Sequence, residues 1–337
     1  MKGINRMKDG NQSRGLLTVG GLAMLTTSLV FSLVAPAVSA NAATKKYTIG
    51  LLIPQGDQYF QSVVTGLKSA VKKDGGKVIV VNTNNDAGQE AQAVQNLLSR
   101  KVDAIMMQPA TSTAGSIATM KSVRKAKTIL ICYGNCSGDT ASPAIVNGVV
   151  QSDNTALGTG TGVAAAAYIK SKLGGTAVIG ILNCDSFDVC KLRKSGFKEA
   201  LSAAGVKATY VADQEGYLVD KATPIAANML SGDPTINLMW SANEGGTAGI
   251  VAAVTASGKK IPVFGTDISV QLAQLLQDPA DILQASTGQD GFGTAVKAYA
   301  LAKNALKGKK NSPLEVGVKG ATYSRTAPAE ITKYLGK

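Results

Sequence analysis

From residue 47 onward, short β-branched runs alternate with longer segments in which apolar residues recur at helical spacing. The strand-like runs are 48–53, 77–81, 104–108, 128–131, 144–150, 176–182, 208–212, 238–241, 261–265 and 282–287. The helix-like segments are 60–73, 91–98, 114–124, 155–173, 191–204, 222–230, 245–256, 269–276 and 294–307. This alternation predicts βαβ units, and therefore parallel sheets with helices on both faces.

About ten strands are too many for one comfortable domain of this kind. We therefore predict an α/β protein with two doubly wound, Rossmann-like domains whose strand ends face one ligand pocket. The first domain is expected near 45–152 and the second near 153–288. The helix 294–307 follows the last strand of the second half and is expected to return to the first domain.

The first 42 residues differ from the rest of the chain. A basic head is followed by an uncharged stretch, 15–34, and by small residues in the pattern of a cleavage site. These features predict a secretory signal peptide over 1–42, with a permanent membrane anchor as the alternative. No cysteine lies near the cleavage site, so a lipid anchor is disfavoured. We expect the mature chain to be periplasmic or secreted.

Composition removes several classes of function. The chain contains no histidine, which excludes Ser-His-Asp and Cys-His catalysis and any His-ligated metal. Without the four basic residues and one acidic residue of 1–42, the formal net charge falls from +13 to +10. The lysines are scattered in pairs rather than gathered in an arm, so we expect a solvated basic surface without a nucleic-acid partner. No cofactor, metal site or catalytic residue is predicted.

Four cysteines bracket two loops that follow predicted strands. They are Cys132 and Cys136 in one loop and Cys184 and Cys190 in the other. In an exported protein such cysteines indicate disulfides. Pairing within each loop is the simplest arrangement, cross-pairing between the loops stays open, and a four-thiolate metal site is the weaker alternative.

Polar and aromatic residues directly after strands are the candidate ligand contacts, because open parallel sheets bind ligands at the carboxyl ends of their strands. These residues are Asp57, Tyr59, Phe60, Tyr133, Asn135, Asp185, Asn243, Glu244, Asp267 and Gln289. Asn243 and Asp267 could instead be helix N-caps. The glycines of 158–162 lie inside a helical pattern, which favours close helix packing over a dinucleotide loop.

The order and spacing of several motifs resemble a known family. They are 49–53 followed by Asp57-Gln58-Tyr59-Phe60, NTNN at 82–85, DAIMMQPA at 103–110, Ser152-Asp153-Asn154 with Gly158, RKSGF at 193–197, ANE at 242–244, FGTD at 264–267 and Gln289-Asp290. Residues 47–323 thus resemble the type I periplasmic solute-binding proteins of ABC transporters, in particular the ribose-binding-protein-like sugar binders. The lactose-repressor family shares the domain fold, but here a signal peptide stands where its DNA-binding headpiece would be.

The resemblance implies two α/β domains joined by three chain crossings that close over a sugar like a hinge. The first domain would comprise 45–152 plus about 290–319, and the second 153–289 plus about 320–337. It places Asp57 in the first ligand loop, and Tyr59 and Phe60 where aromatics stack on the sugar. Lys191 falls where sugar binders often have Arg, and Tyr217 where they have an aromatic residue. Asn243, Asp267 and Gln289 match partners of the ring hydroxyls.

Two departures from the family pattern bear on the ligand. Tyr133-Gly134-Asn135 replaces the Asp followed by Arg or Ser that often comes after the fourth strand, and Lys191 lacks the two-pronged donor of Arg. Both weaken the case for ribose and leave another pentose, a hexose or a polyol open.

The resulting hypothesis is an exported, monomeric substrate-binding protein that captures a small sugar or polyol and delivers it to a membrane ABC permease. A periplasmic co-receptor for chemotaxis or signalling is the alternative, and a secreted enzyme on the same scaffold is disfavoured by the missing histidine.

Overall fold

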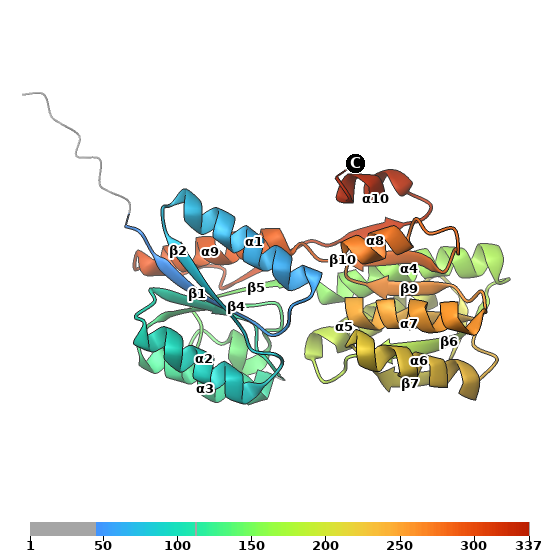
Figure 1. Cartoon of the computed structure of the whole chain (residues 1–337), viewed down its shortest axis with the longest axis horizontal. Helices are drawn as coiled ribbons and strands as arrows, with labels where there is room; N and C mark the ends of the chain where they lie inside the picture. Colours follow the sequence, from blue (N-terminus) through green and yellow to red (C-terminus); the bar gives the residue numbers. More distant parts are fainter. Residues whose placement is uncertain (1–44, 112, 337) are drawn as a thin grey trace, which may run out of the picture. The chain divides into compact units, whose positions relative to one another are not determined.

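Strands and helices alternate along most of the chain (Figure 1). The structure is a computed structural model, which describes residues 45–111 and 113–336. The strands are β1 (Thr48–Ile53), β2 (Lys77–Asn82), β3 (Ala104–Met107), β4 (Ile129–Tyr133), β5 (Gly148–Ser152), β6 (Thr176–Asn183), β7 (Lys207–Glu215), β8 (Leu238–Ser241), β9 (Val263–Thr266), β10 (Leu283–Gly288), β11 (Glu315–Val318) and β12 (Ala321–Ser324). The helices are α1 (Gln58–Lys73), α2 (Ala87–Ser99), α3 (Thr113–Lys125), α4 (Asn154–Lys172), α5 (Asp188–Ala203), α6 (Val219–Gly232), α7 (Glu244–Ser257), α8 (Val270–Leu275), α9 (Gly291–Leu306) and α10 (Pro328–Tyr334), with a short 3₁₀ helix, η1 (Gly138–Ala141).

The strands form two six-stranded sheets of matching topology. Their orders are β11-β5-β4-β3-β1-β2 and β12-β10-β9-β8-β6-β7. Every neighbouring pair is parallel except β10 and β12, which are antiparallel. The chain passes from one sheet to the other after β5, after β10 and after β11. The predicted fold class, two doubly wound α/β halves with three crossings, is confirmed.

Helices cover both faces of the first sheet, because its strands are apolar on both sides. In β1, Ile49, Leu51 and Ile53 pack in a core with α1 and α9, whereas Leu52 faces the core formed with α2 and α3. Figure 1 shows α1 and α9 on one face and α2 and α3 on the other. Thus α9 rejoins the first sheet although it follows β10, as predicted.

The second sheet is covered in the same way. One face packs against α4 and α5, and the other against α6, α7 and α8. A Cβ added to Gly158 of α4 would lie 1.8 Å from the carbonyl oxygen of Arg193 in α5. Gly158 and Gly162 therefore serve close packing between these two helices, as predicted, whereas Gly160 faces Thr287 and Thr322 of the sheet. The segment lies inside α4 and does not form a nucleotide loop.

Some predicted boundaries were wrong. The predicted strand 144–150 begins only at Gly148, because Ser142 starts a turn in which its carbonyl accepts the amide hydrogens of Ile145 and Val146, each at 2.9 Å. The last three elements, β11, β12 and α10, were not predicted. The proposed domain boundaries stay a prediction, and the proposed signal peptide lies outside the described residues. Within the described residues, no helix is both long and apolar enough to cross a membrane.

Candidate functional site

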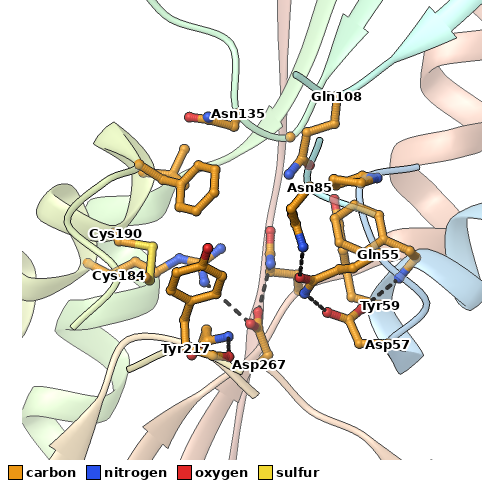
Figure 2. A pocket seen from close by; sticks show the side chains of 18 residues that line it. Gln55, Asp57, Tyr59, Asn85, Gln108, Asn135, Cys184, Cys190, Tyr217 and Asp267 are labelled. Atoms are coloured by element: carbon orange, nitrogen blue, oxygen red, sulfur yellow. Dashed lines mark hydrogen bonds and ion pairs between the residues drawn. A yellow bond between two sulfur atoms is a disulfide. The ribbon is translucent and has the colours of Figure 1, made fainter. Parts of the chain in front are cut away.

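A pocket lies at the carboxyl ends of strands from both sheets (Figure 2). The cavity has a volume of about 80 Å³. Its lining residues are Pro54, Gln55, Asp57, Tyr59, Phe60, Asn85, Gln108, Gly134, Asn135, Cys184, Phe187, Val189, Cys190, Arg193, Tyr217, Asn243, Asp267 and Gln289. Both halves of the fold therefore contribute side chains to one site.

Asp57 follows β1 and has two functions. Its side chain caps α1 by accepting the amide hydrogen of Phe60 at 3.1 Å, which satisfies a helix end. It also accepts a hydrogen bond from the side-chain amide of Gln55, whose side-chain oxygen accepts the Asn85 side-chain amide at 3.1 Å. Burial raises the pKa of Asp57, and no cationic side chain pairs with it among the described residues.

Two adjacent aromatic residues begin α1 at the edge of the pocket. The rings of Tyr59 and Phe60 meet edge to face with their centroids 5.0 Å apart, and both are buried. Burial raises the pKa of the Tyr59 phenol, so the side chain stays neutral near pH 7. Together the two rings supply an apolar surface beside the carboxylate of Asp57.

The pocket also contains a buried charge pair. The guanidinium of Arg193 lies 3.3 Å from Asp267, whose carboxylate also accepts the Gln289 amide at 2.7 Å and the backbone amide of Glu244 at 3.2 Å. The side-chain oxygen of Gln289 in turn accepts a hydrogen bond from the hydroxyl of Ser152, at the end of β5, at 3.0 Å. This network joins side chains beside two of the three chain crossings and fixes the direction of the Asp267 oxygens.

A second wall of the pocket is mainly apolar. The rings of Phe187 and Tyr217 meet edge to face with centroids 5.6 Å apart, beside Val189 and the Cys184–Cys190 disulfide. Asn243 supports this wall from behind: its amide donates to the Tyr217 carbonyl at 2.8 Å while its oxygen caps α7. The predicted capping function of Asn243 is thus present together with its place in the pocket.

The cysteines pair within each loop. Cys132 bonds Cys136, and Cys184 bonds Cys190. The predicted disulfides are confirmed in their simplest arrangement, and the alternatives of cross-pairing and a four-thiolate metal site are excluded because all four sulfurs are in these two bonds.

The structure brings together most of the candidate ligand residues. Those that line the pocket are Asp57, Tyr59, Phe60, Asn135, Tyr217, Asn243, Asp267 and Gln289. Tyr133 does not: it is fully buried and donates its hydroxyl to the Leu52 carbonyl at 2.8 Å in the core of the first sheet. Lys191 also lies outside the lining, because its half-exposed amine bonds Asp188 at 3.1 Å.

Sequence reasoning missed Arg193 as a site residue, although it was part of a motif that carried the resemblance. The side chain is only 5% exposed and belongs to a buried stripe of α5 with Gly196, Phe197, Ala200 and Leu201. A basic residue in line with such a stripe is buried and must find polar partners inside the protein. This sequence pattern could have identified Arg193 as a site residue.

Comparisons with known proteins found a matching family and related sequences. The periplasmic binding protein domain family matches residues 49–310. The ABC transporter periplasmic-binding protein YphF of Escherichia coli is 32% identical over 279 residues, covering 81% of this chain and 85% of the relative. The ribose import binding protein RbsB of Bacillus subtilis is 30% identical over 275 residues, covering 80% and 86%.

Solved structures show the same fold. A periplasmic solute-binding protein from Actinobacillus succinogenes with bound D-allose superposes with a TM-score of 0.75 at 23% identity, covering 85% of this chain and all of that one. From the family match and these relatives, we conclude that the chain belongs to the periplasmic binding protein family.

Proposed function

We propose that this chain is an exported substrate-binding protein that captures a small sugar or polyol in its pocket and delivers it to an ABC permease. The observation that supports this most is the composition of the pocket: buried carboxylate, amide and guanidinium groups face aromatic rings at the ends of both sheets. Relatives named for ribose import, and fold neighbours with bound D-allose, allitol and myo-inositol, support the same ligand class.

The chemistry of the ligand fits the two kinds of wall. A sugar has apolar faces and a rim of hydroxyl groups. Tyr59, Phe60 and Tyr217 would contact its faces, whereas Asp57 and Asp267 would accept from its rim. Once the rim is buried, each hydroxyl needs a partner, so a ligand with a misplaced hydroxyl loses affinity.

The proposed ligand contacts are most of the residues expected from the sequence, with one addition. They are Asp57, Tyr59, Phe60, Asn135, Tyr217, Asn243, Asp267 and Gln289, together with Arg193. We leave out Tyr133 and Lys191, whose polar atoms bind Leu52 and Asp188. Export through the predicted leader 1–42 and a monomeric state belong to the same proposal.

A thermal-shift screen of the mature chain tests the proposal. The probes are D-ribose, D-allose, allitol, myo-inositol and a set of amino acids. A ligand at 100 times its Kd adds about 2.7 kcal/mol of stability, which raises the Tm by a few degrees in a protein of this size. We expect a sugar or polyol to produce this shift.

Two variants locate the effect. Asp267→Ala should abolish the shift, because it removes an acceptor at the centre of the pocket network. Lys191→Ala, on an exposed side chain of the same half, should retain it. A shift with an amino acid alone would contradict the sugar assignment, and a shift retained in Asp267→Ala would contradict the site.

A further inference from the structure

Both disulfides bracket loops that line the pocket. Cys132–Cys136 encloses Gly134 and Asn135, which follow β4 in the first sheet. The Cys184–Cys190 bond follows β6 in the second sheet. Both of its cysteines line the pocket together with Phe187 and Val189. Each half of the fold thus presents one cross-linked loop to the same space. Figure 2 shows Asn135 of the first loop and the Cys184–Cys190 bond of the second.

The two loops also touch each other. The hydroxyl of Ser137, next to Cys136, donates to the carboxylate of Asp188 at 2.9 Å. Asp188 lies between Cys184 and Cys190 and also accepts the amine of Lys191 at 3.1 Å. These hydrogen bonds lower the pKa of Asp188, so the carboxylate is charged at neutral pH and the contact is charge-assisted.

Asn135 is the polar group that the first loop holds in place. It is 1% exposed, it lines the pocket, and within the described part of the chain neither its amide nitrogen nor its oxygen has a hydrogen-bond partner. A buried amide left without partners is unfavourable. A ligand hydroxyl, which both donates and accepts, would satisfy it.

The backbone around Asn135 leaves little freedom. Gly134 has a φ of +73°, where other residues are strained, and its amide donates to the Val150 carbonyl at 2.9 Å. A Cβ at this position would lie 1.8 Å from the Gln108 side-chain oxygen. The two cysteines of the disulfide flank this tight turn. The bond therefore restrains the segment that orients the Asn135 side chain.

The rings that the disulfides close are short, with sequence separations of 4 and 6. Short rings remove little entropy from the unfolded chain, so such bonds stabilise the whole fold less than long-range ones. Restraining a binding loop in its bound shape has a different effect, because it lowers the ordering cost of binding. On this basis, and resting on the proposed function, we propose that the two disulfides position the pocket loops, with Cys132–Cys136 holding Asn135 as a specificity-determining contact for a ligand hydroxyl.

Paired variants test the proposal: Cys132→Ser/Cys136→Ser and Cys184→Ser/Cys190→Ser. Calorimetric titration uses D-ribose, D-allose, allitol and myo-inositol as probes. Relative to the native chain, we expect each pair to raise the Kd of the bound probe at least tenfold. The midpoint of urea unfolding should fall only modestly. A Kd within twofold of the native value in both pairs overturns the proposal.

A double-mutant cycle tests the link to Asn135. Asn135→Ala should weaken binding at least tenfold in the native background but less than threefold in Cys132→Ser/Cys136→Ser, because the positioned amide is then already lost. Equal effects in both backgrounds would show that the disulfide does not act through Asn135.

Hydrogen exchange of the ligand-free protein gives a readout that needs no ligand. Amides of 133–136 and 184–190 should exchange faster in the corresponding variant, while those of β1 and β8 stay unchanged. If a pair of variants fails to fold, the same measurement on native protein treated with a phosphine reductant replaces it. Unchanged loop exchange overturns the positioning proposal, whereas altered exchange in a chain that binds none of the probes would contradict only the sugar assignment.

Discussion

Arg193 reaches three acceptors from one position of α5: the Asp267 carboxylate, the Ala242 carbonyl at 2.9 Å and the Asn154 side-chain oxygen at 3.0 Å. Removing the guanidinium leaves Asp267 buried without its counter-ion. We therefore expect Arg193→Met to lower the free energy of unfolding by about 3–5 kcal/mol. Urea unfolding at neutral pH measures this loss.

Lys191 supplies the matched control two residues earlier on the same helix. Its ion pair with Asp188 is half exposed on both sides, and such pairs contribute roughly 0–1 kcal/mol. Lys191→Met should therefore change the free energy of unfolding by less than about 1 kcal/mol. Similar losses in the two variants would contradict the assignment of Arg193 as the buried charge of the site.

Because of Glu244, the first residue of α7, we expect the free energy of unfolding to depend on pH. Burial, followed by the nearby carboxylates of Asp57 and Asp267, raises its pKa from 4.5 to about 7. A raised pKa means that the folded state favours the protonated form, so the stabilisation is present below pH 4.5 and is lost as the pH rises through about 7. The effect should be about 1–3 kcal/mol.

Glu244→Gln isolates this contribution, because it removes the Glu244 carboxyl and keeps Asp57, the other nearby carboxyl with a raised pKa. Urea midpoints measured from pH 4 to pH 8 should fall more steeply for the native chain than for the variant. Parallel curves would show that Glu244 does not titrate in this range.

At the level of single residues, the sequence indicated which strand ends would carry the site but not every side chain that reaches it. Asp267 directly follows the apolar strand β9, and Asp57 follows β1 after a three-residue loop, so their position alone was informative. Lys191 and Arg193 are two residues apart on a helix, so they point to different sides. Arg193 is the one that enters the pocket, because it lies in line with the buried stripe of α5, whereas Lys191 lies off that stripe.

At the level of elements, helices α4 and α5 pack very closely at Gly158. A Cβ at Gly158 would meet the Arg193 carbonyl oxygen at 1.8 Å and the Phe197 amide nitrogen at 2.9 Å. Because both are backbone atoms, the helices must move apart. Gly158→Ala should cost about 3 kcal/mol or more and should weaken ligand binding by displacing Arg193.

Gly232, at the end of α6, is the control for this substitution. A Cβ there meets nothing within 4 Å, so Gly232→Ala should leave binding unchanged and stabilise the chain by at most about 1 kcal/mol. Thermal unfolding and ligand titration of the two variants give both readouts. Native-like stability in Gly158→Ala would mean that the two helices are not in this close contact.

The elements that the sequence predicted share a physical basis. Strands such as β1 and β8 are buried on both faces, so they appear as uninterrupted apolar runs. In contrast, β11 and β12 are four-residue edge strands with mostly exposed or half-buried positions, and β12 pairs antiparallel with β10. Because these strands are short and only partly apolar, the local pattern does not distinguish them from loops.

For the whole molecule, the arrangement of the site predicts a conformational response. Asp57 and Asn135 follow strands of the first sheet, whereas Tyr217 and Asp267 follow strands of the second. The sheets are joined by short crossings between β5 and α4, β10 and α9, and β11 and β12. A ligand that contacts both sets of residues at once stabilises those arrangements of the two halves in which both sets reach it. The size of this stabilisation is the difference in ligand affinity between these arrangements and the others.

Small-angle scattering measures this response in solution. Adding a saturating concentration of the sugar or polyol found in the thermal-shift screen should lower the radius of gyration of the native chain. The same addition should leave Asp267→Ala unchanged, because that variant lacks the acceptor that Arg193 and Gln289 hold in the pocket. Superimposable curves with and without a ligand that binds would show that binding does not select among arrangements of the two halves, and that the pocket is preformed before the ligand arrives.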